Sequence, residues 1–160
     1  MICGLSMNQT ITIVSGLPRS GTSLMMQMLD SGGMEVVTDN IRPPDEDNPK
    51  GYYEFEKAKK IKEDPSWLKD MRGKAFKIVS MLLYDLPADE KYKVIFMKRN
   101  MDEILSSQNK MLERLGQNPN PDDEMGELFA KHLNKTFNGL LCKRILKYFV
   151  SVTTISLRIH

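Results

Sequence analysis

A chain of 160 residues is long enough for one domain with a single hydrophobic core and too short for two ordinary domains. Hydrophobic residues make up 41% of it, which is typical of a globular protein and argues against a disordered one. The formal net charge of +2 gives no bulk electrostatic case for a nucleic-acid binder, so any anion must be bound by a local site.

The cysteines and the two ends of the chain indicate a cytoplasmic protein. Cys3 and Cys142 form neither a CxxC pair nor a metal-ligand spacing, which argues against a disulfide scaffold or a zinc site and favours reduced thiols. The N-terminus lacks the basic region of a signal peptide. The uncharged stretch 148–157 of the tail is too short to span a bilayer, so we expect no membrane span.

In the first half of the chain, hydrophobic periodicity predicts strands that alternate with helices. The predicted elements are a strand over 10–15, a helix over 21–31, a short strand over 35–38, a charged helix over 54–64 and a short helix over 66–71. Gly32 and Gly33 are expected to end the first helix, and Ser66 to cap the last one. Three prolines and a glycine make the segment 39–53 irregular.

The second half of the chain continues the alternation. The predicted elements are strands over 75–79 and 93–99, a helix that runs from Asn100 to about Leu115, a helix that starts at Pro121, and a strand over 149–157. Asn100 is expected to cap its helix, with Glu103 completing a capping box. The apolar residues that the later helix is expected to direct inward are Met125, Leu128, Phe129, Leu133 and Phe137.

This order of elements predicts a single α/β domain over residues 1–160. Strands that alternate with helices form a central parallel sheet covered by helices on both faces, a three-layer α/β/α arrangement. Ligands of such sheets bind beyond the carboxyl ends of the strands. The loop after the first strand and the turn at Arg99 both lie at that edge, so we expect them to converge in space.

The loop after the first strand has the pattern of an anion-binding loop. From Gly16 to Ser23 it reads Gly-Leu-Pro-Arg-Ser-Gly-Thr-Ser, with the glycine spacing of a phosphate-binding loop. Its backbone N–H groups and hydroxyls would converge on an anion at the start of the next helix. Thr22 stands where a nucleotide triphosphatase requires lysine, and the cation of the loop is Arg19 instead. The alternative is an ordinary strand–turn–helix junction with a capping serine.

The segment 18–23 resembles the 5′-phosphosulfate-binding loop of the sulfotransferases that use 3′-phosphoadenosine 5′-phosphosulfate (PAPS). The resemblance implies a fold like that of the P-loop nucleoside triphosphate hydrolases. It also implies that the basic residue faces the sulfate and bridging oxygen while hydroxyls and N–H groups hold the 5′-phosphate. The residues it assigns to the donor in this loop are Arg19, Ser20, Gly21, Thr22 and Ser23.

A second motif resembles the 3′-phosphate site of the same family. Arg99 is placed at the end of a strand, asparagine follows it, and Ser107 lies eight residues on in the next helix. Arginine gives a bidentate, charged grip on phosphate, and the serine adds a neutral donor. The alternatives are a surface ion pair for Arg99 and a packing role for Ser107 between Ile104 and Met111.

The resemblance implies transfer of a sulfuryl group from PAPS to a hydroxyl or amine of a small-molecule or carbohydrate acceptor, with adenosine 3′,5′-bisphosphate (PAP) as product and no metal. Arg19 is expected to stabilise the leaving phosphate oxygen. His132 and His160 lie outside the region between the two motifs, where soluble small-molecule sulfotransferases place a histidine base. We therefore expect a carboxylate base. The first candidate is Glu54, and the others are Asp39, Asp47 and Glu56.

Several points stay open at this stage. Glu54 could be a solvated residue at a helix start, and Lys77 could reach the donor or face solvent. Tyr52 and Tyr53, in the irregular segment, are expected to form part of the acceptor pocket or a lid. The tail after Asn138 lacks the late segment with which family members close over the adenosine, which implies either a compact member or a shortened chain.

Two other functions remain as alternatives. One is a nucleotide triphosphatase or kinase, with Asp85 as the magnesium-binding aspartate after an apolar strand, although the adjoining Leu86 and Pro87 suggest a loop and the missing lysine argues against it. The other is a non-catalytic nucleotide-binding module that kept the anion loop.

Overall fold

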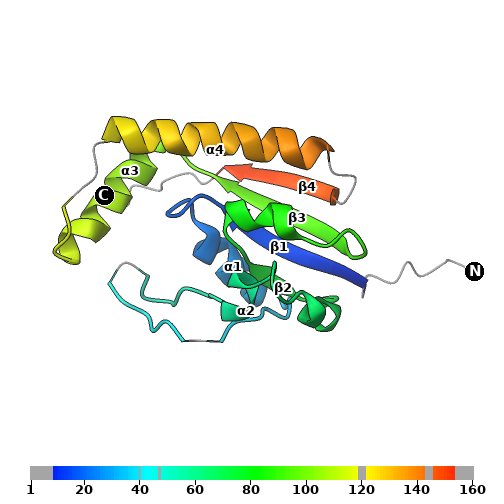
Figure 1. Cartoon of the computed structure of the whole chain (residues 1–160). Coiled ribbons are helices and arrows are strands. Elements are labelled where there is room, and N and C mark those ends of the chain that lie inside the picture. The colour runs from blue at the N-terminus through cyan, green and yellow to red at the C-terminus, as the bar shows by residue number, and fades with distance from the viewer. Residues whose placement is uncertain (1–8, 40, 47, 119–121, 143–145, 154–160) are drawn as a thin grey trace, which may run out of the picture.

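The computed structural model describes residues 9–39, 41–46, 48–118, 122–142 and 146–153. Four strands in these residues form one parallel sheet in the order β2-β1-β3-β4 (Figure 1). The strands are β1 (Thr10–Gly16), β2 (Ala75–Lys77), β3 (Lys91–Lys98) and β4 (Leu146–Thr153). The prediction of a mixed α/β fold with a parallel sheet is confirmed.

The predicted helices are confirmed where the apolar periodicity extends over several turns, as in the helices that begin near residues 21, 100 and 121. The structure has four α-helices and two 3₁₀ helices in its described part: α1 (Thr22–Ser31), α2 (Glu56–Lys59), η2 (Ser66–Met71), η3 (Ser80–Asp85), α3 (Met101–Arg114) and α4 (Asp122–Cys142). No described helix combines the length and the apolar character needed to cross a bilayer. The predicted charged helix over 54–64 is reduced to the single turn of α2, because the chain turns at Lys60 and Pro65 disfavours helical backbone at the residue before it.

Three local predictions are wrong. The short strand over 35–38 is a single parallel bridge between Val36 and Ala75. Ser66 does not cap η2 with its side chain; the carboxylate of Asp64 accepts a hydrogen bond from the Ser66 N–H at 3.0 Å instead. Leu128 of α4 is 61% exposed, because that helix packs along a narrow stripe that includes Leu133.

Both faces of the sheet are covered. Alternate residues of β1 point to opposite sides, so Ile11 and Ile13 join one apolar cluster while Val14 joins another. The first cluster includes residues of α2, η2 and η3 and is contacted by Leu133 of α4. The second cluster includes Met26 of α1. α1 and α4 therefore lie on opposite faces of the sheet (Figure 1).

The order of the strands creates a crevice at the carboxyl end of β1. From β1 the chain passes through α1 to the β2 side of the sheet, and it later returns to place β3 on the other side. Loops that leave a parallel sheet in opposite directions from neighbouring strands open a space at the sheet edge. The loop between β1 and α1 and the turn after β3 both lie at this edge.

Some sequence predictions fall outside the described residues. These are Cys3, Asp47, Pro121, His160, the side chains of Phe137 and Cys142, and the part of the predicted last strand beyond Thr153.

His132 joins α4 to η3. Its Nε2 hydrogen-bonds with Ser80 Oγ at 2.7 Å and lies 3.3 Å from Thr136 Oγ1, and both hydroxyl residues are fully buried. Burial lowers the pKa of His132, and the charge of Lys135 acts in the same direction.

We expect His132→Gln to reduce the loss of stability in acid. The unfolded chain binds a proton at this histidine near the ordinary pKa of 6.5 and the folded protein binds it at lower pH, so stability falls as the pH drops through 6.5. Glutamine stays neutral and can still bond Ser80. Urea denaturation at about pH 7.5 and about pH 5.5 measures the effect. An equal fall in the free energy of unfolding in both proteins would contradict it.

Candidate functional site

A cavity of about 600 Å³ lies at the carboxyl end of β1, a volume within the range of small-molecule sites. Its lining comes from the loop after β1, the segment before α2, the end of β2 with η3, and α3. The site residues expected from sequence that line it are Arg19, Gly21, Thr22, Ser23, Tyr52, Glu54, Lys77, Arg99 and Ser107. The two motifs therefore meet at one cavity.

The N-terminus of α1 directs backbone donors toward this cavity. Gly21 precedes the helix with φ of 96°, a left-handed conformation that glycine adopts without strain. The first bond of the helix runs from the Met25 N–H to the Gly21 carbonyl at 3.1 Å. The N–H groups of Thr22, Ser23 and Leu24 precede that bond, so they have no partner within the helix and can bind an anion.

Ser20 supports the loop instead of facing the cavity. Its side chain is buried, and its hydroxyl donates a hydrogen bond to the Leu17 carbonyl at 2.7 Å. A Cβ at Gly16 would lie 2.5 Å from Ser20 Oγ and 2.8 Å from the Met97 carbonyl oxygen, so the loop closes against β3 only with glycine there. Among the hydroxyl residues expected to bind phosphate, Thr22 and Ser23 line the cavity and Ser20 does not.

Arg19 joins the two motifs directly. Its Nε donates a hydrogen bond to Ser107 Oγ at 2.9 Å, and Arg99 Nη1 donates to the Arg19 carbonyl at 3.1 Å. Arg19 has φ of 63°, an uncommon backbone conformation for a residue other than glycine and one that clusters at functional sites. The loop is thus held in an uncommon shape by contacts from Ser107 of α3 and from Arg99 in the turn before that helix.

The turn after β3 differs from the sequence prediction in one detail. The Asn100 side chain caps α3 by accepting a hydrogen bond from the Asp102 N–H at 2.8 Å, as predicted. Glu103 does not complete a capping box, because its carboxylate accepts a hydrogen bond from Arg99 Nε at 2.8 Å. Arg99 therefore fits both interpretations offered for it, because it forms an ion pair with Glu103 and also lines the cavity.

Lys77 lies in the cavity wall next to the phosphate loop. Its Nζ donates hydrogen bonds to Ser23 Oγ at 3.3 Å and to the Tyr52 carbonyl, and Ser23 Oγ also donates to that carbonyl at 3.1 Å. Burial lowers the pKa of Lys77 to about 8, although the Glu54 carboxylate acts in the opposite direction. Lys77 therefore brings a cation from β2 to a loop that lacks the lysine of nucleotide triphosphatases.

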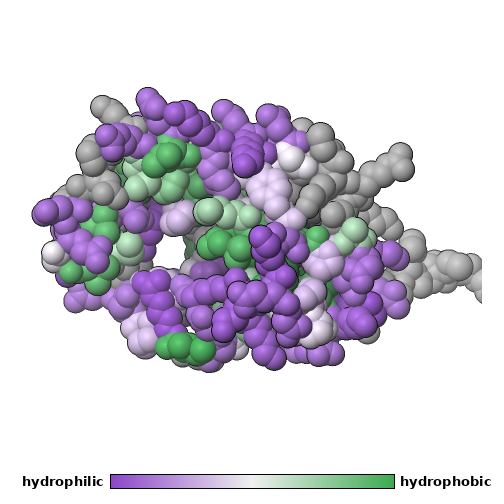
Figure 2. Space-filling view, viewed as in Figure 1, coloured by the Kyte–Doolittle hydropathy of each residue, from purple (hydrophilic) through white to green (hydrophobic). Residues whose placement is uncertain are grey.

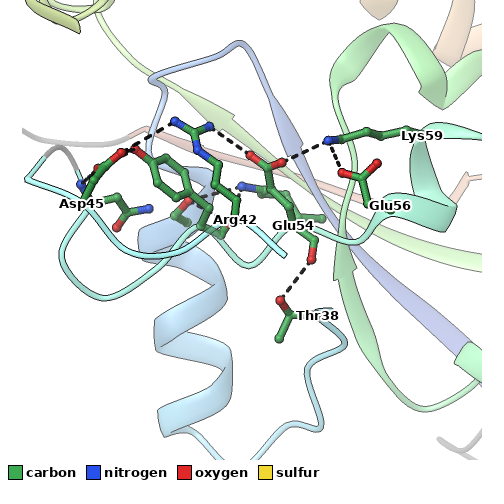
Figure 3. A network of polar contacts seen from close by, with 10 residues as sticks. Thr38, Arg42, Asp45, Glu54, Glu56 and Lys59 are labelled. Atoms are coloured by element: carbon green, nitrogen blue, oxygen red, sulfur yellow. Dashed lines mark hydrogen bonds and ion pairs between the residues drawn. The ribbon is translucent and has the colours of Figure 1, made fainter. Parts of the chain in front are cut away.

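Glu54 lines the cavity as a doubly ion-paired carboxylate. Figure 3 shows Arg42 on one side of it and Lys59 on the other, each with a nitrogen 3.2 Å from a different carboxylate oxygen. Burial acts to raise the pKa of Glu54, but Lys59, Lys77 and Arg42 outweigh it and hold the pKa below its usual value. The guanidinium of Arg42 also lies 3.4 Å from the centre of the Tyr52 ring.

The other candidate bases are used elsewhere. Asp39 accepts hydrogen bonds from the backbone N–H groups of Ile41 and Glu56, which fixes the start of α2, and Glu56 pairs with Lys59 outside the cavity lining. Tyr53 points to α1, with its hydroxyl 3.3 Å from Asp30.

Asp85 does not follow an apolar strand, as the nucleotide triphosphatase alternative requires, because it ends the 3₁₀ helix η3.

The cavity concentrates positive charge in a chain whose net charge is small. Among its described lining residues, five are cationic and one is acidic, a formal balance of +4. The cationic residues are Arg19, Arg42, Lys59, Lys77 and Arg99. Sequence reasoning missed Arg42 and Lys59, because nothing in their local sequence distinguishes them from other surface cations.

Gln108, also missed, has a buried side-chain oxygen for which the described residues supply no partner.

Comparison with known proteins gives no family. No protein-family model matches this sequence, and a search of curated proteins returned no match. The described residues contain no group of three or more His, Cys, Asp or Glu side chains that could hold a metal ion.

Binding of an inorganic anion is expected to weaken as the pH rises through about 8, where Lys77 loses its charge. Sulfate is a suitable probe because its own charge does not change in this range. Calorimetric titration between about pH 7 and about pH 9 should show a loss of affinity of about tenfold, the order of one pKa unit of interaction. Lys77→Met should bind weakly at both pH values, and an unchanged pH dependence in this variant would contradict the assignment.

Proposed function

We propose that this protein is a PAPS-dependent sulfotransferase, built as a three-layer α/β/α domain like the P-loop nucleoside triphosphate hydrolases. The observation that carries the proposal is the contact between the two motifs, from Arg19 Nε to Ser107 Oγ and from Arg99 to the Arg19 carbonyl, at one cationic cavity. A cytoplasmic location belongs to the proposal and rests on the cysteine usage.

The residues present fit a donor that carries charge at two ends. The N-terminus of α1 offers three backbone N–H groups to a 5′-phosphosulfate, and Arg19 of the loop and Lys77 of β2 line the same cavity. Arg99 and Ser107 offer a charged fork and a hydroxyl to a 3′-phosphate. Arg19 lies between these two groups, so one ligand in the cavity can contact both.

PAPS supplies a sulfuryl group bonded to a phosphate oxygen; that sulfur–oxygen bond breaks as a bond from sulfur to the acceptor oxygen forms. The chain's own task is to orient the reactants and to stabilise the charge on the leaving phosphate. Arg19 places a fixed positive charge at the loop, and the N–H groups of α1 add dipoles that need no rearrangement. PAP and a sulfate ester are the products.

Glu54 is the proposed acceptor of the hydroxyl proton. Its pairs with Arg42 and Lys59 keep it ionised at neutral pH and also reduce its basicity. A weak base is sufficient if the transition state is loose, as in phosphoryl transfer, because the acceptor oxygen then loses its proton late. The same ion pairs favour a second function, a nucleotide-binding module without catalysis, in which Glu54 only organises the two cations.

The proposal predicts tight binding of PAP without a metal. Calorimetry should show that PAP binds in the presence of a chelator and more tightly than magnesium ATP. Arg99→Ala should weaken PAP binding by about tenfold or more, because a charge-assisted hydrogen bond contributes about 1.5–3 kcal/mol. Lys110→Ala, which removes an exposed cation from the helix α3 that follows Arg99 and lies outside the cavity lining, is the matched control. A preference for magnesium ATP would support a nucleotide triphosphatase or kinase instead.

Turnover separates the enzyme from the binding module. With labelled PAPS and a panel of acceptors, Arg19→Ala should lower kcat by on the order of 10²–10³ with little change in the circular dichroism spectrum. Glu54→Gln should lower it by on the order of 10²–10⁴. Glu56→Gln, which also loses a pair with Lys59 but lies outside the cavity lining, should retain activity. PAP binding without transfer to any acceptor would support the non-catalytic module.

A further inference from the structure

The cavity has an apolar wall that the anion-binding groups do not use. Its members come from separate elements: Phe55 precedes α2, Ile78 and Val79 follow β2, Leu82 lies in η3 and Met111 lies in α3. Figure 2 shows this face of the molecule hollowed, with hydrophobic residues beside the opening and hydrophilic residues around much of its rim.

The wall is rigid at its base and open at its rim. The Phe55 ring packs edge-on against Trp67 at 5.2 Å and against Phe76 at 6.5 Å between ring centres, so its position is fixed by the core. Val79, by contrast, is 52% exposed although it is large and apolar. When a ligand covers exposed apolar side chains, it removes their surface from water, and this lowers the free energy of the complex.

The wall adjoins the anion site. Met111 lies four residues after Ser107 on α3, about 6 Å along the helix axis, and both residues line the cavity. Gln108 lies between them in sequence, and its buried side-chain oxygen has no partner among the described residues. The neighbouring wall offers a ligand only hydrocarbon contact.

We propose that the acceptor is an alcohol or phenol with an apolar body, which packs against Phe55, Val79, Leu82 and Met111 while its hydroxyl faces the anion site. The inference rests on the proposed sulfotransferase function and specifies its substrate class. A carbohydrate would place several hydroxyl groups against this wall, where they would lose hydrogen bonds to water without replacement. In the transfer the acceptor oxygen bonds to sulfur, its proton passes to the Glu54 carboxylate, and PAP departs.

Binding of a 4-alkylphenol series to the protein saturated with PAP tests the proposal without relying on turnover. Calorimetry should show affinity rising by about fourfold for each added methylene until the wall is covered. Val79→Thr, which keeps the side-chain shape, and Leu82→Asn should weaken binding of the longer phenols by several-fold and leave PAP affinity unchanged. Met81→Asn is the matched control, because Met81 is 68% exposed in the same helix and lies outside the cavity lining.

The outcomes are distinguishable. Chain-length dependence that Val79→Thr weakens and Met81→Asn preserves supports the proposal, and transfer from labelled PAPS should then rank the phenols in the same order. If PAP binds but the phenols show no chain-length dependence, or only sugars are bound and sulfated, the acceptor class is wrong while the sulfotransferase proposal stands. If PAP itself does not bind, both proposals are wrong.

Discussion

The register between β1 and β3 is the constraint on which the site depends. Gly16 pairs with Met97 at the ends of the two strands, so the phosphate loop and the turn at Arg99 leave the sheet side by side. A slip by one residue would exchange the two faces of a strand and separate the loops. The absence of a side chain at Gly16 permits this closeness, since a Cβ there would collide with the Met97 carbonyl. One glycine at one register position thus makes the contact between Arg19 and Ser107 possible.

Gathering five cations around one cavity costs electrostatic energy, and the arrangement of Glu54 offsets part of it. Its two carboxylate oxygens pair with Arg42 and Lys59, and its charge also acts on the half-buried Lys77. Even so, five cations face one carboxylate among the described lining residues, and the charges of Arg42 and Lys59 act together with burial to lower the pKa of Lys77. A bound anion would relieve this imbalance. The same charges that make the empty arrangement costly therefore favour a doubly charged ligand over a neutral one.

The sequence predicted those parts of the fold whose causes are local or strongly periodic. The apolar runs of β1 and β3, the periodicity of α1 and α3, and the glycine-bounded loop are all of this kind, and the convergence of the two loops follows from parallel topology alone. Two of the failures concern helix caps. Ser66 and Glu103 are good capping residues in isolation, but in the folded chain Asp64 accepts a hydrogen bond from the Ser66 N–H, and Arg99 binds the Glu103 carboxylate. The pairing of Arg42 with Glu54 could not be foreseen, because it depends on how an irregular segment lies against α2.

Tyr52 links the anion-binding part of the cavity to its acceptor side. Its carbonyl receives hydrogen bonds from both Ser23 and Lys77 of the phosphate-loop region, while its ring supports Arg42 and its hydroxyl bonds to Asp45. A phosphate at the N-terminus of α1 would compete with that carbonyl for Ser23 and Lys77. Such competition would act on the backbone that carries Glu54 and Phe55, two residues of the proposed acceptor site. In the proposed sulfotransferase, donor and acceptor binding would therefore be coupled through one peptide group, without a separate moving domain.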